Sequence, residues 1–500
     1  MPDLERLGQR DSWNGVRAVV AGFGVSGFAV ADTLTHLGAS VVVLGETESP
    51  EIAERAELLR ILGADVRLGP GVATALPADA GHVDLVVVSP GFRPDAPLLT
   101  EARAAGIPVW GEVELAWRLR DTAAAGGAAP WLCVTGTNGK TTTVRMLDAI
   151  LRAAGLRSDA VGNVGRPIVE AVMDPEPYDV LAVELSSFQL HYTDSMAAES
   201  AAVLNIAEDH LDWYDDMASY AADKGRIFER VRRACVYNVD DPETERLVRE
   251  ADVEEGARAI GFTLGIPSVG MVGLVDDVLA DRAFVDERHN SAAELCTLAD
   301  LDWDGRAGRS GGPAPHVVAN ALAAAALARA HGVSQQAVRD GLRGFRPDGH
   351  RISTVATNEG VTYVDDSKAT NPHAARASLQ AYDPVVWIAG GLAKGAVFDD
   401  LVASVRDRLR GVVLLGRDRD VIAGALSRHA PDVPVILLDD GETGPDQSQP
   451  MDRAVNAARR LAQPGDTVLL APGCASMDMF SDYAARGDAF VAAVQRTKGH

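Results

Sequence analysis

The chain has 500 residues, of which 47% are hydrophobic and 24% are charged. These proportions are typical of an ordinary globular protein, and the length allows about three domains. The formal net charge of -24 argues against a surface that binds nucleic acid or an anionic membrane. No apolar run approaches the roughly 20 residues of a membrane span, and the N-terminus lacks the apolar core of a signal peptide.

The first part of the chain alternates short apolar runs with helical patterns, which predicts an α/β block with a mostly parallel sheet. The expected strands cover residues 18–21, 40–44, 85–89 and 108–110. The glycine pattern Gly22-x-Gly24-x-x-Gly27 follows the first strand and is typical of a turn that binds a dinucleotide phosphate. The acidic residue expected at the end of the second strand is not clear, because Leu44 occupies that end and Glu46 lies beyond it. We interpret the turn as a nucleotide diphosphate site; an NAD site and a purely structural tight turn remain open.

A stretch of small residues at 122–130 predicts a flexible connection to a second block. There the sequence TGTNGKTT, at 135–142, lies between an apolar strand at 131–134 and a helical pattern. Such a turn directs backbone N–H groups and a helix N-terminus at one point, which favours an anion. Lys140 adds a positive charge, and the hydroxyl of Thr141 suits Mg²⁺ on a phosphate. This predicts a nucleoside triphosphate site with a loop shorter than the common one, and a chance Gly-Lys-Thr is the alternative.

Polar residues follow two more expected strands of the second block. Glu184 ends a strand at 180–183, and His210 follows a strand at 202–206. Parallel neighbours would bring both side chains to the edge that carries Lys140 and Thr141, where they suit Mg²⁺. For Glu184 taken alone, the alternative is an N-capping or surface carboxylate. For His210 taken alone, it is an ordinary loop histidine.

Two further features of this block come from local patterns. A glycine- and proline-rich loop at 305–315 precedes an expected helix at 318–330. Lys224 lies on another expected helix, and composition alone predicts that its side chain is solvated.

The third block begins near residue 347 and again alternates strands with helices. Its expected strands cover residues 362–364, 385–389, 412–415, 435–438 and 467–471. Lysines and hydroxyls follow three of these strands, in the segments DDSKATNP (365–372), GGLAKG (390–395) and PGCAS (472–476). Together they favour a pocket for a small anionic substrate, and ordinary polar loops are the alternative.

These motifs resemble those of the bacterial Mur ligases along essentially the whole chain. The segments that carry the resemblance are GTNGKTT (136–142), GNVG (162–165), ELSSFQL (184–190), NIAEDHLD (205–212), DDSKATNPHA (365–374), AGGLAKG (389–395) and APGCASMDMF (471–480). The last three resemble the branch of the family that adds D-glutamate. The resemblance implies an α/β protein with an N-terminal Rossmann-like domain at 1–111 for a UDP-linked substrate. It also implies a central P-loop ATPase-type domain at 112–347 and a C-terminal Rossmann-like domain at 348–500 for D-glutamate.

The resemblance also implies a role for individual residues. The ATP site would comprise Gly136, Thr137, Asn138, Gly139, Lys140, Thr141, Thr142, Thr143, His316, Asn320, Arg351 and Asp366. The UDP-substrate site would comprise Gly24, Ser26, Gly27, Ser89, Pro90, Gly91 and Asn163. D-glutamate would be surrounded by Lys368, Thr370, Lys394, Ser476 and Tyr483. One Mg²⁺ would be held by Thr141 and Glu184, and a second by His210 and Lys224. Family members carry a carbamate on the lysine that matches Lys224, which turns a cation into an anionic metal ligand.

Four positions depart from the family pattern. Gly45 and Glu46 stand where other uracil contacts are expected, so the uracil pocket stays open. Tyr483 stands where some members have phenylalanine, and Val317 where an asparagine can occur.

The reaction that the resemblance implies uses ATP to phosphorylate the carboxylate of UDP-N-acetylmuramoyl-L-alanine. The amine of D-glutamate then attacks the acyl phosphate. Little covalent chemistry falls to the protein, which positions the substrates and neutralises charge. An NAD-dependent oxidoreductase and a non-catalytic nucleotide-binding protein are the alternatives. We expect a cytoplasmic monomer, with reduced thiols at its four scattered cysteines (Cys133, Cys235, Cys296 and Cys474).

Overall fold

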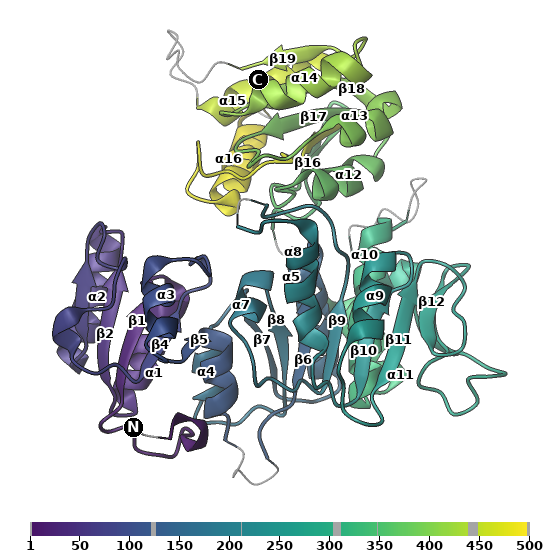
Figure 1. The fold of residues 1–500 in the computed structure, drawn as a ribbon. Coiled ribbons are helices and arrows are strands. Elements are labelled where there is room, and N and C mark those ends of the chain that lie inside the picture. The colour runs from purple at the N-terminus through teal and green to yellow at the C-terminus, as the bar shows by residue number, and fades with distance from the viewer. Residues whose placement is uncertain are drawn as a thin grey trace. The chain divides into compact units, whose positions relative to one another are not determined.

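The computed structural model describes residues 3–121, 127–211, 213–303, 312–347, 349–438 and 449–497. The chain divides into two compact units (Figure 1). The first unit comprises residues 1–206, 218–297 and 320–344, and the second comprises residues 207–217, 298–319 and 345–500. The first unit contains two sheets and the second contains one, so the chain has the three α/β blocks that its sequence predicts.

The first sheet has five parallel strands in the order β3-β2-β1-β4-β5. Its strands are β1 (Arg17–Ala21), β2 (Ser40–Gly45), β3 (Asp65–Leu68), β4 (Leu85–Val88) and β5 (Val109–Gly111). The helices of this block are α1 (Val25–His36), α2 (Pro50–Leu62), α3 (Pro97–Ala104) and α4 (Glu112–Leu119). The order places β1 beside β4, so the loops after these two strands meet at one edge of the sheet, as in a Rossmann-like domain.

The central sheet has nine strands in the order β14-β13-β12-β11-β10-β9-β6-β8-β7, and only its β12–β14 end is antiparallel. The strands are β6 (Trp131–Thr135), β7 (Ser158–Gly162), β8 (Val180–Glu184), β9 (Ser200–Val203), β10 (Ala234–Asn238), β11 (Arg258–Thr263), β12 (Met271–Val275), β13 (Val278–Asp281) and β14 (Ala293–Thr297). The helices are α5 (Lys140–Ala153), α6 (Ile168–Val172), α7 (Ser187–His191), α8 (Met217–Gly225), α9 (Pro242–Glu250), α10 (Pro315–His331) and α11 (Gln335–Gly344).

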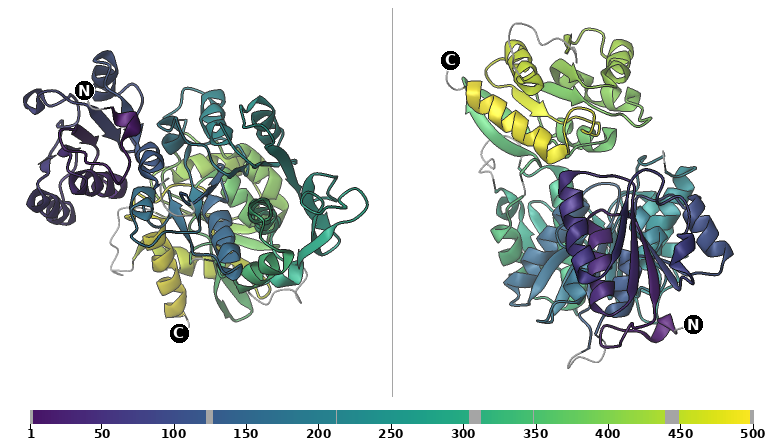
Figure 2. Two further views of the ribbon diagram at one scale, coloured as in Figure 1. Left: turned by 90° about the horizontal axis from the view of Figure 1, so that it is seen from below. Right: turned by 90° about the vertical axis from the view of Figure 1, so that its left-hand side faces the viewer.

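The third sheet has six strands in the order β15-β16-β20-β17-β18-β19. The strands are β15 (Ser353–Asn358), β16 (Val361–Asp365), β17 (Val385–Gly390), β18 (Leu409–Leu415), β19 (Val435–Leu437) and β20 (Thr467–Leu470), and only β15 runs antiparallel to its neighbour. The helices are α12 (Pro372–Gln380), α13 (Asp399–Val405), α14 (Arg419–His429), α15 (Pro450–Leu461) and α16 (Tyr483–Arg496). The yellow helix α16 packs against α15 and against β15 and β16 (Figure 2).

Most expected strands are present, and one is shifted. The strand expected at 202–206 lies instead at Ser200–Val203, because the chain after Val203 leaves the sheet and the side chain of Asn205 binds the phosphate loop. The loop expected at 305–315 and the connection at 122–130 fall partly outside the described residues. The short strands β3, β7, β10–β14 and β15 were not predicted, since several carry polar residues on exposed or half-buried faces.

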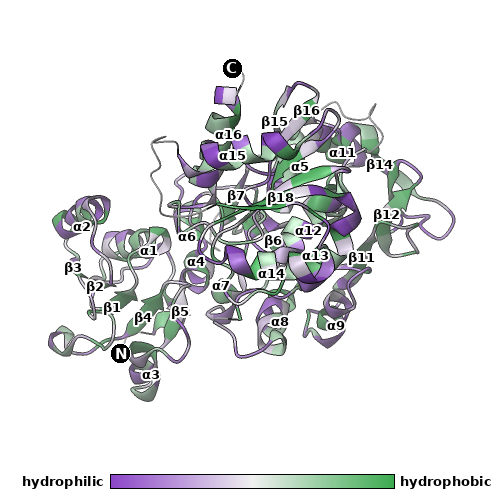
Figure 3. Cartoon of the chain, turned by 90° about the horizontal axis from the view of Figure 1, so that it is seen from above, coloured by the Kyte–Doolittle hydropathy of each residue, from purple (hydrophilic) through white to green (hydrophobic). Residues whose placement is uncertain are grey.

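The core consists mainly of these strands. The β6 and β8 strands are buried along their whole length, as are β4 and β20. Colouring by hydropathy shows hydrophobic strands and helices that carry hydrophilic residues (Figure 3). This is the pattern of parallel sheets covered by amphipathic helices. In the described part of the chain, every helix is too short or too polar to cross a membrane.

Candidate active site

The predicted phosphate loop joins the buried strand β6 to helix α5. Two of its glycines have positive φ, Gly136 at 149° and Gly139 at 85°. A Cβ on Gly136 would lie 3.0 Å from that of Leu204, and one on Gly139 would lie 2.4 Å from Oδ1 of Asn320. Both positions therefore favour glycine by conformation and by space. The turn leaves the first N–H groups of α5 without helical partners, which is the geometry that binds an anion.

Two lysines donate to one carbonyl oxygen of this loop. Nζ of Lys140 lies 2.8 Å from the oxygen of Gly136 and 2.9 Å from that of Thr137. Nζ of Lys224 lies 3.0 Å from the same Gly136 oxygen. Lys224 is 2% exposed, so the expectation from composition that it is solvated is wrong. Helix α8 carries Lys224 into the loop, and the ring of Tyr220 lies 4.7 Å from its Nζ.

Residues outside the motif fix the shape of the loop. The side chain of Asn205 accepts from the N–H of Asn138 at 2.9 Å and donates to its carbonyl at 3.1 Å. The hydroxyls of Thr137 and Tyr220 lie 3.0 Å apart. Neither Asn205 nor Tyr220 was predicted as a site residue. Asn205 belongs to the segment after β9 and could have been found there.

Glu184 lies at the end of β8, next to the strand that leads into the phosphate loop. Its side chain is 1% exposed; Oε1 accepts from Nδ2 of Asn163 at 2.8 Å, and Oε2 has no hydrogen-bond partner. A buried carboxylate oxygen without a partner costs free energy unless a cation or donor binds it. The predicted surface or N-capping alternative for Glu184 is therefore wrong. Thr141 is also buried, at the start of α5.

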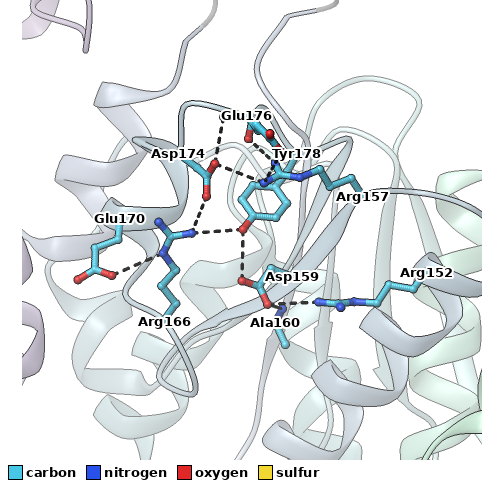
Figure 4. Close-up of polar contacts among 9 residues, drawn as sticks. All are labelled: Arg152, Arg157, Asp159, Ala160, Arg166, Glu170, Asp174, Glu176 and Tyr178. Atoms are coloured by element: carbon cyan, nitrogen blue, oxygen red, sulfur yellow. Dashed lines mark hydrogen bonds and ion pairs between the residues drawn. The ribbon is translucent and has the colours of Figure 1, made fainter.

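The loop that carries Asn163 is braced by a polar network (Figure 4). Nη1 of Arg166 donates to Asp174 at 2.7 Å and to the hydroxyl of Tyr178 at 3.3 Å. That hydroxyl donates to Asp159 at 3.4 Å, and Arg157 lies over the ring of Tyr178 at 4.1 Å. The network joins both ends of the loop 162–166, so that Asn163 is held beside Glu184.

The glycine pattern of the first block forms a tight turn between β1 and α1. Gly22 has φ 103°, and a Cβ on Gly27 would lie 2.0 Å from the carbonyl oxygen of Gly22. Ser89, after β4, lies at the same edge, and its buried Oγ has no hydrogen-bond partner. Ser89 and Gly91 line a pocket of about 550 Å³. Gly24 is exposed, while Ser26 and Pro90 are half-buried. The structure thus brings most of the predicted UDP-site residues to one edge, and Asn163 lies in the central block.

The two departures in this block have structural partners. A Cβ on Gly45 would lie 2.7 Å from Leu68 and 2.9 Å from Phe23, so a larger residue does not fit. The Glu46 carboxylate accepts from the N–H groups of Gly71 at 2.7 Å and Ala73 at 2.9 Å. Glu46 therefore holds the loop after β3.

In the second unit, two of the strand-end loops meet around the buried side chain of Arg486, and a third loop pairs with one of them. Its guanidinium donates to Oγ of Ser367 at 2.9 Å, to the carbonyl of Ser367 at 2.8 Å and to that of Cys474 at 3.0 Å. Leu392 pairs with Ala475 through backbone hydrogen bonds of 2.9 Å. The predicted segments 365–372, 390–395 and 472–476 therefore form one cluster. Arg486 was not predicted, because a lone arginine on a helix has no distinguishing pattern.

The predicted D-glutamate residues lie on these loops. Nζ of Lys368 lies 3.8 Å from the ring centre of Tyr483, a cation–π contact. Lys394 is exposed and has φ 50°, an uncommon conformation for a residue other than glycine. Thr370 is half-buried, and Ser476 is 4% exposed.

Asp366 follows β16 and is buried. It accepts a short hydrogen bond from Oγ of Ser378. Burial raises the pKa of its carboxyl to about 6, against the hydrogen bond from Ser378 and the charge of Arg351, which lower it. Burial and the nearby His373 lower the pKa of His316 to about 4, so His316 is neutral at pH 7.

His210 belongs to the short segment 207–217 of the second unit. It has φ 57°, and its Nε2 lies 3.8 Å from Oδ2 of Asp209, which accepts from Asn371 at 3.2 Å. Its predicted approach to Lys140 and Glu184 stays a prediction. No group of three His, Cys, Asp or Glu side chains that could hold a metal occurs among the described residues. A metal site here would need the hydroxyl of Thr141 or a modified lysine.

The comparisons with known proteins agree with this geometry. Residues 16–111 match the Mur ligase MurD-like N-terminal domain, 134–328 the Mur ligase middle domain, and 350–474 the glutamate ligase domain of Mur ligases. The UDP-N-acetylmuramoylalanine--D-glutamate ligase of Streptomyces avermitilis is 59% identical over 97% of this chain and 99% of its own. The ligase of the same name from Streptomyces coelicolor is 58% identical over 97% of this chain and 98% of its own.

One solved structure shares the fold along the whole length. It is a pseudomurein peptide ligase type C from Methanothermus fervidus, with a TM-score of 0.55 and 17% identity over 97% of this chain and 100% of that one. At this identity the likeness concerns the fold. The three matched domains and the near-full-length relatives identify the chain as a member of the Mur ligase family.

Proposed function

We propose that the chain is an ATP-dependent ligase that adds D-glutamate to UDP-N-acetylmuramoyl-L-alanine in peptidoglycan precursor synthesis. The observation that carries this proposal is the identity of 46–59% to ligases of that name over nearly the full length. The phosphate loop, the glycine turn of the first block and the lysine-bearing loops of the third supply a site for each substrate. The oxidoreductase and the non-catalytic alternatives explain only one of these sites each.

The residues divide the work as follows. Gly136–Thr143 binds the ATP phosphates, Lys140 neutralises charge on the transferred phosphoryl group, and His316, Asn320, Arg351 and Asp366 bind the rest of the nucleotide. The transfer converts the UDP-linked carboxylate into an acyl phosphate. The acyl phosphate has a better leaving group than the free acid. The amine of D-glutamate, held by Lys368, Thr370, Lys394, Ser476 and Tyr483, attacks the acyl carbon, and phosphate leaves.

The residues present fit a divalent cation. Glu184 offers a buried oxygen without a partner, and Thr141 a buried hydroxyl on the neighbouring loop. When bound, Mg²⁺ neutralises the developing charge on the phosphoryl oxygens. Lys224 and His210 would serve a second ion. Because Lys224 and Lys140 share one carbonyl acceptor, their positive charges oppose each other. Carbamylation of Lys224 removes this repulsion and supplies an anionic ligand.

The domain boundaries that go with this function are 1–111, 112–347 and 348–500. The protein acts as a cytoplasmic monomer on small molecules and binds neither nucleic acid nor membrane. The matched ranges 16–111, 134–328 and 350–474 fall inside these three domains.

The test is phosphate release from ATP, measured with UDP-N-acetylmuramoyl-L-alanine and each D- and L-amino acid in turn. We expect release that depends on D-glutamate and on the UDP substrate, with a ligated product detected by mass spectrometry. Phosphate release that is independent of both substrates would favour a nucleotide-binding protein instead. Turnover with another amino acid would place the chain elsewhere among ligases.

A further inference from the structure

A second pocket in the first unit is lined largely by arginines. It has a volume of about 440 Å³ and is formed by residues before β10 and β11, the loop after β13 and the end of α10. Figure 1 labels β10, β11 and α10. The arginines are Arg232, Arg233, Arg258, Arg288 and Arg329. Asp286 is the single carboxylate among the lining residues, all of which are described. In a chain of net charge -24, this is a local concentration of positive charge.

Two of the five arginines have structural partners. Nε of Arg329 lies 2.9 Å from Oδ2 of the buried Asp281, and its Nη1 donates to the carbonyl of Val333 at 2.6 Å. Arg233 lies 3.4 Å from Oε1 of Glu199. That oxygen is also 2.8 Å from Nδ1 of His331. Carboxylates of the protein itself balance these two positive charges, so these two arginines need no ligand.

The other three arginines differ from these two. No ion pair within 4.0 Å joins Arg232, Arg258 or Arg288 to a carboxylate of the described chain. Arg258 donates to the carbonyl of Ala283 at 2.6 Å and lies 5.3 Å from the ring centre of Phe284. These contacts hold its guanidinium at the pocket. Partial desolvation and the charge of Arg288 lower the pKa of Arg258, and the charge of Asp281 opposes them, so the two cations lie close enough to repel each other.

The pocket is separate from the ATP site. Strands β6, β9, β10 and β11 are parallel, and the phosphate loop follows the carboxyl end of β6. Arg232, Arg233 and Arg258 precede or begin β10 and β11, so they lie at the opposite edge of the same sheet. Its volume lies within the range of about 300–1,000 Å³ that is common for small-molecule sites.

We propose that this pocket binds a small polyanion that carries phosphate groups, of the pyrophosphate or nucleoside diphosphate class. The planar guanidinium fork matches phosphate oxygens in pairs, and a dianion between Arg258 and Arg288 removes their mutual repulsion. Phe284 also lines the pocket and provides an aromatic side chain beside the arginines. The proposal does not depend on the ligase activity.

The test is calorimetric titration of inorganic pyrophosphate, without Mg²⁺, into four full-length proteins. These are the wild type, Lys140→Ala, the pocket variant Arg258→Glu/Arg288→Glu and the control Arg55→Glu/Arg406→Glu. The control changes the net charge equally at two exposed arginines outside the pocket. We expect a binding event that persists in Lys140→Ala, and is therefore distinct from the phosphate loop, that is unchanged in the control, and that weakens about tenfold or more in the pocket variant. Equal binding by the pocket variant and the control would overturn the proposal.

Three further arms make the result specific. Thermal melting checks that the pocket variant folds. If it does not, Arg258→Gln/Arg288→Gln replaces it, and we expect a smaller loss of pyrophosphate affinity in that variant. UDP in place of pyrophosphate identifies a nucleotide if it binds more tightly and if Phe284→Ala removes that gain. Equal or tighter binding of citrate, which has no phosphate, would overturn the assignment to phosphate, and so would binding only of an acidic peptide.

Discussion

At the scale of single residues, the site contains charged groups that are buried or that lie close to a like charge. Glu184 is buried with one oxygen unpaired, and Lys140 and Lys224 share the carbonyl of Gly136. Asp366 is a buried carboxylate with a raised pKa. Burial of a carboxylate and close approach of two cations both cost stability in the free protein.

The two lysines make separable predictions. We expect Lys140→Ala to lower kcat by about 10²–10³-fold or more with the fold intact, because we propose that its charge neutralises the transferred phosphoryl group. Lys224→Ala should lower activity as well, and short carboxylic acids such as formate should partly restore it by replacing the carbamate. The measurement is ligation rate against formate concentration. Formate should restore nothing in Lys140→Ala, and an unchanged rate in Lys224→Ala would contradict the carbamate.

Asp366 gives a prediction with a pH dependence. Its pKa is about 6 in the folded protein and 3.8 in the reference state, so the folded form holds more protons between these values. Its contribution to stability therefore falls as the pH rises through that window. Asp366→Asn should stabilise the second unit by about 1–3 kcal/mol at pH 8 and by much less near pH 4.

Urea unfolding of Asp366→Asn at both pH values measures this, with Asp407→Asn, at an exposed carboxylate, as the control. ATP affinity should fall in Asp366→Asn although stability rises. A gain in stability that is equal at pH 4 and pH 8 would rule out titration of Asp366 as the cause.

At the scale of elements, each site lies where a parallel strand ends and a helix or loop begins. The turn after β1, the phosphate loop after β6 and the loops after β16, β17 and β20 all follow this arrangement. Glycines occupy these turns, but the positions differ in how much space they leave for a side chain. The carbonyl of Gly22 lies against Gly27, whereas nothing lies within 4 Å of a Cβ placed on Gly24.

Gly27→Ala and Gly24→Ala therefore form a matched pair. Gly27→Ala should destabilise the first unit by about 1–3 kcal/mol, since its Cβ would meet the Gly22 oxygen at 2.0 Å. Gly24→Ala should change stability by less than about 0.5 kcal/mol, as is usual for open positions. Thermal unfolding of the two variants measures the difference. Equal effects would mean that the turn relaxes to admit a side chain.

At the scale of the whole molecule, helix α4 joins the first sheet to the central sheet within the first unit. It follows β5 directly and packs against α6 and α7. Two buried carboxylates of α4 attach this helix to the central block through hydrogen bonds. Oε1 of Glu112 accepts from the N–H of Val169 at 2.7 Å. Glu114 accepts from the N–H groups of Asp194 at 2.8 Å and Ser195 at 2.9 Å, and from Arg118 at 2.6 Å.

Removing the Glu114 carboxylate tests this junction. Glu114→Ala leaves two partly buried N–H groups and a guanidinium without their acceptor, so we expect a loss of about 2–4 kcal/mol of stability in the first unit. Differential scanning calorimetry should show the lower transition in Glu114→Ala. Glu57→Ala, which removes an exposed partner of Arg60 at 3.6 Å, should leave the transition unchanged. A similar loss in both variants would point to net charge rather than to the junction.

The sequence by itself determined the three α/β blocks, most strands and the loops that carry chemistry. Apolar runs, glycine turns and hydroxyl-rich segments are local patterns, and the parallel arrangement follows from their alternation. Helix α8 was also recognised, but the burial of its Lys224 was not. A single lysine has no periodic pattern, and its environment comes from distant residues, Gly136 and Tyr220.

Only the tertiary structure decided which polar groups lack or share partners. It placed Arg486 between two loops, left one oxygen of Glu184 unpaired and gathered five arginines around one pocket, from β11, α10 and the segments before β10 and after β13. The physical reason is that burial and pairing depend on contacts between residues far apart in the chain, which local sequence patterns do not encode.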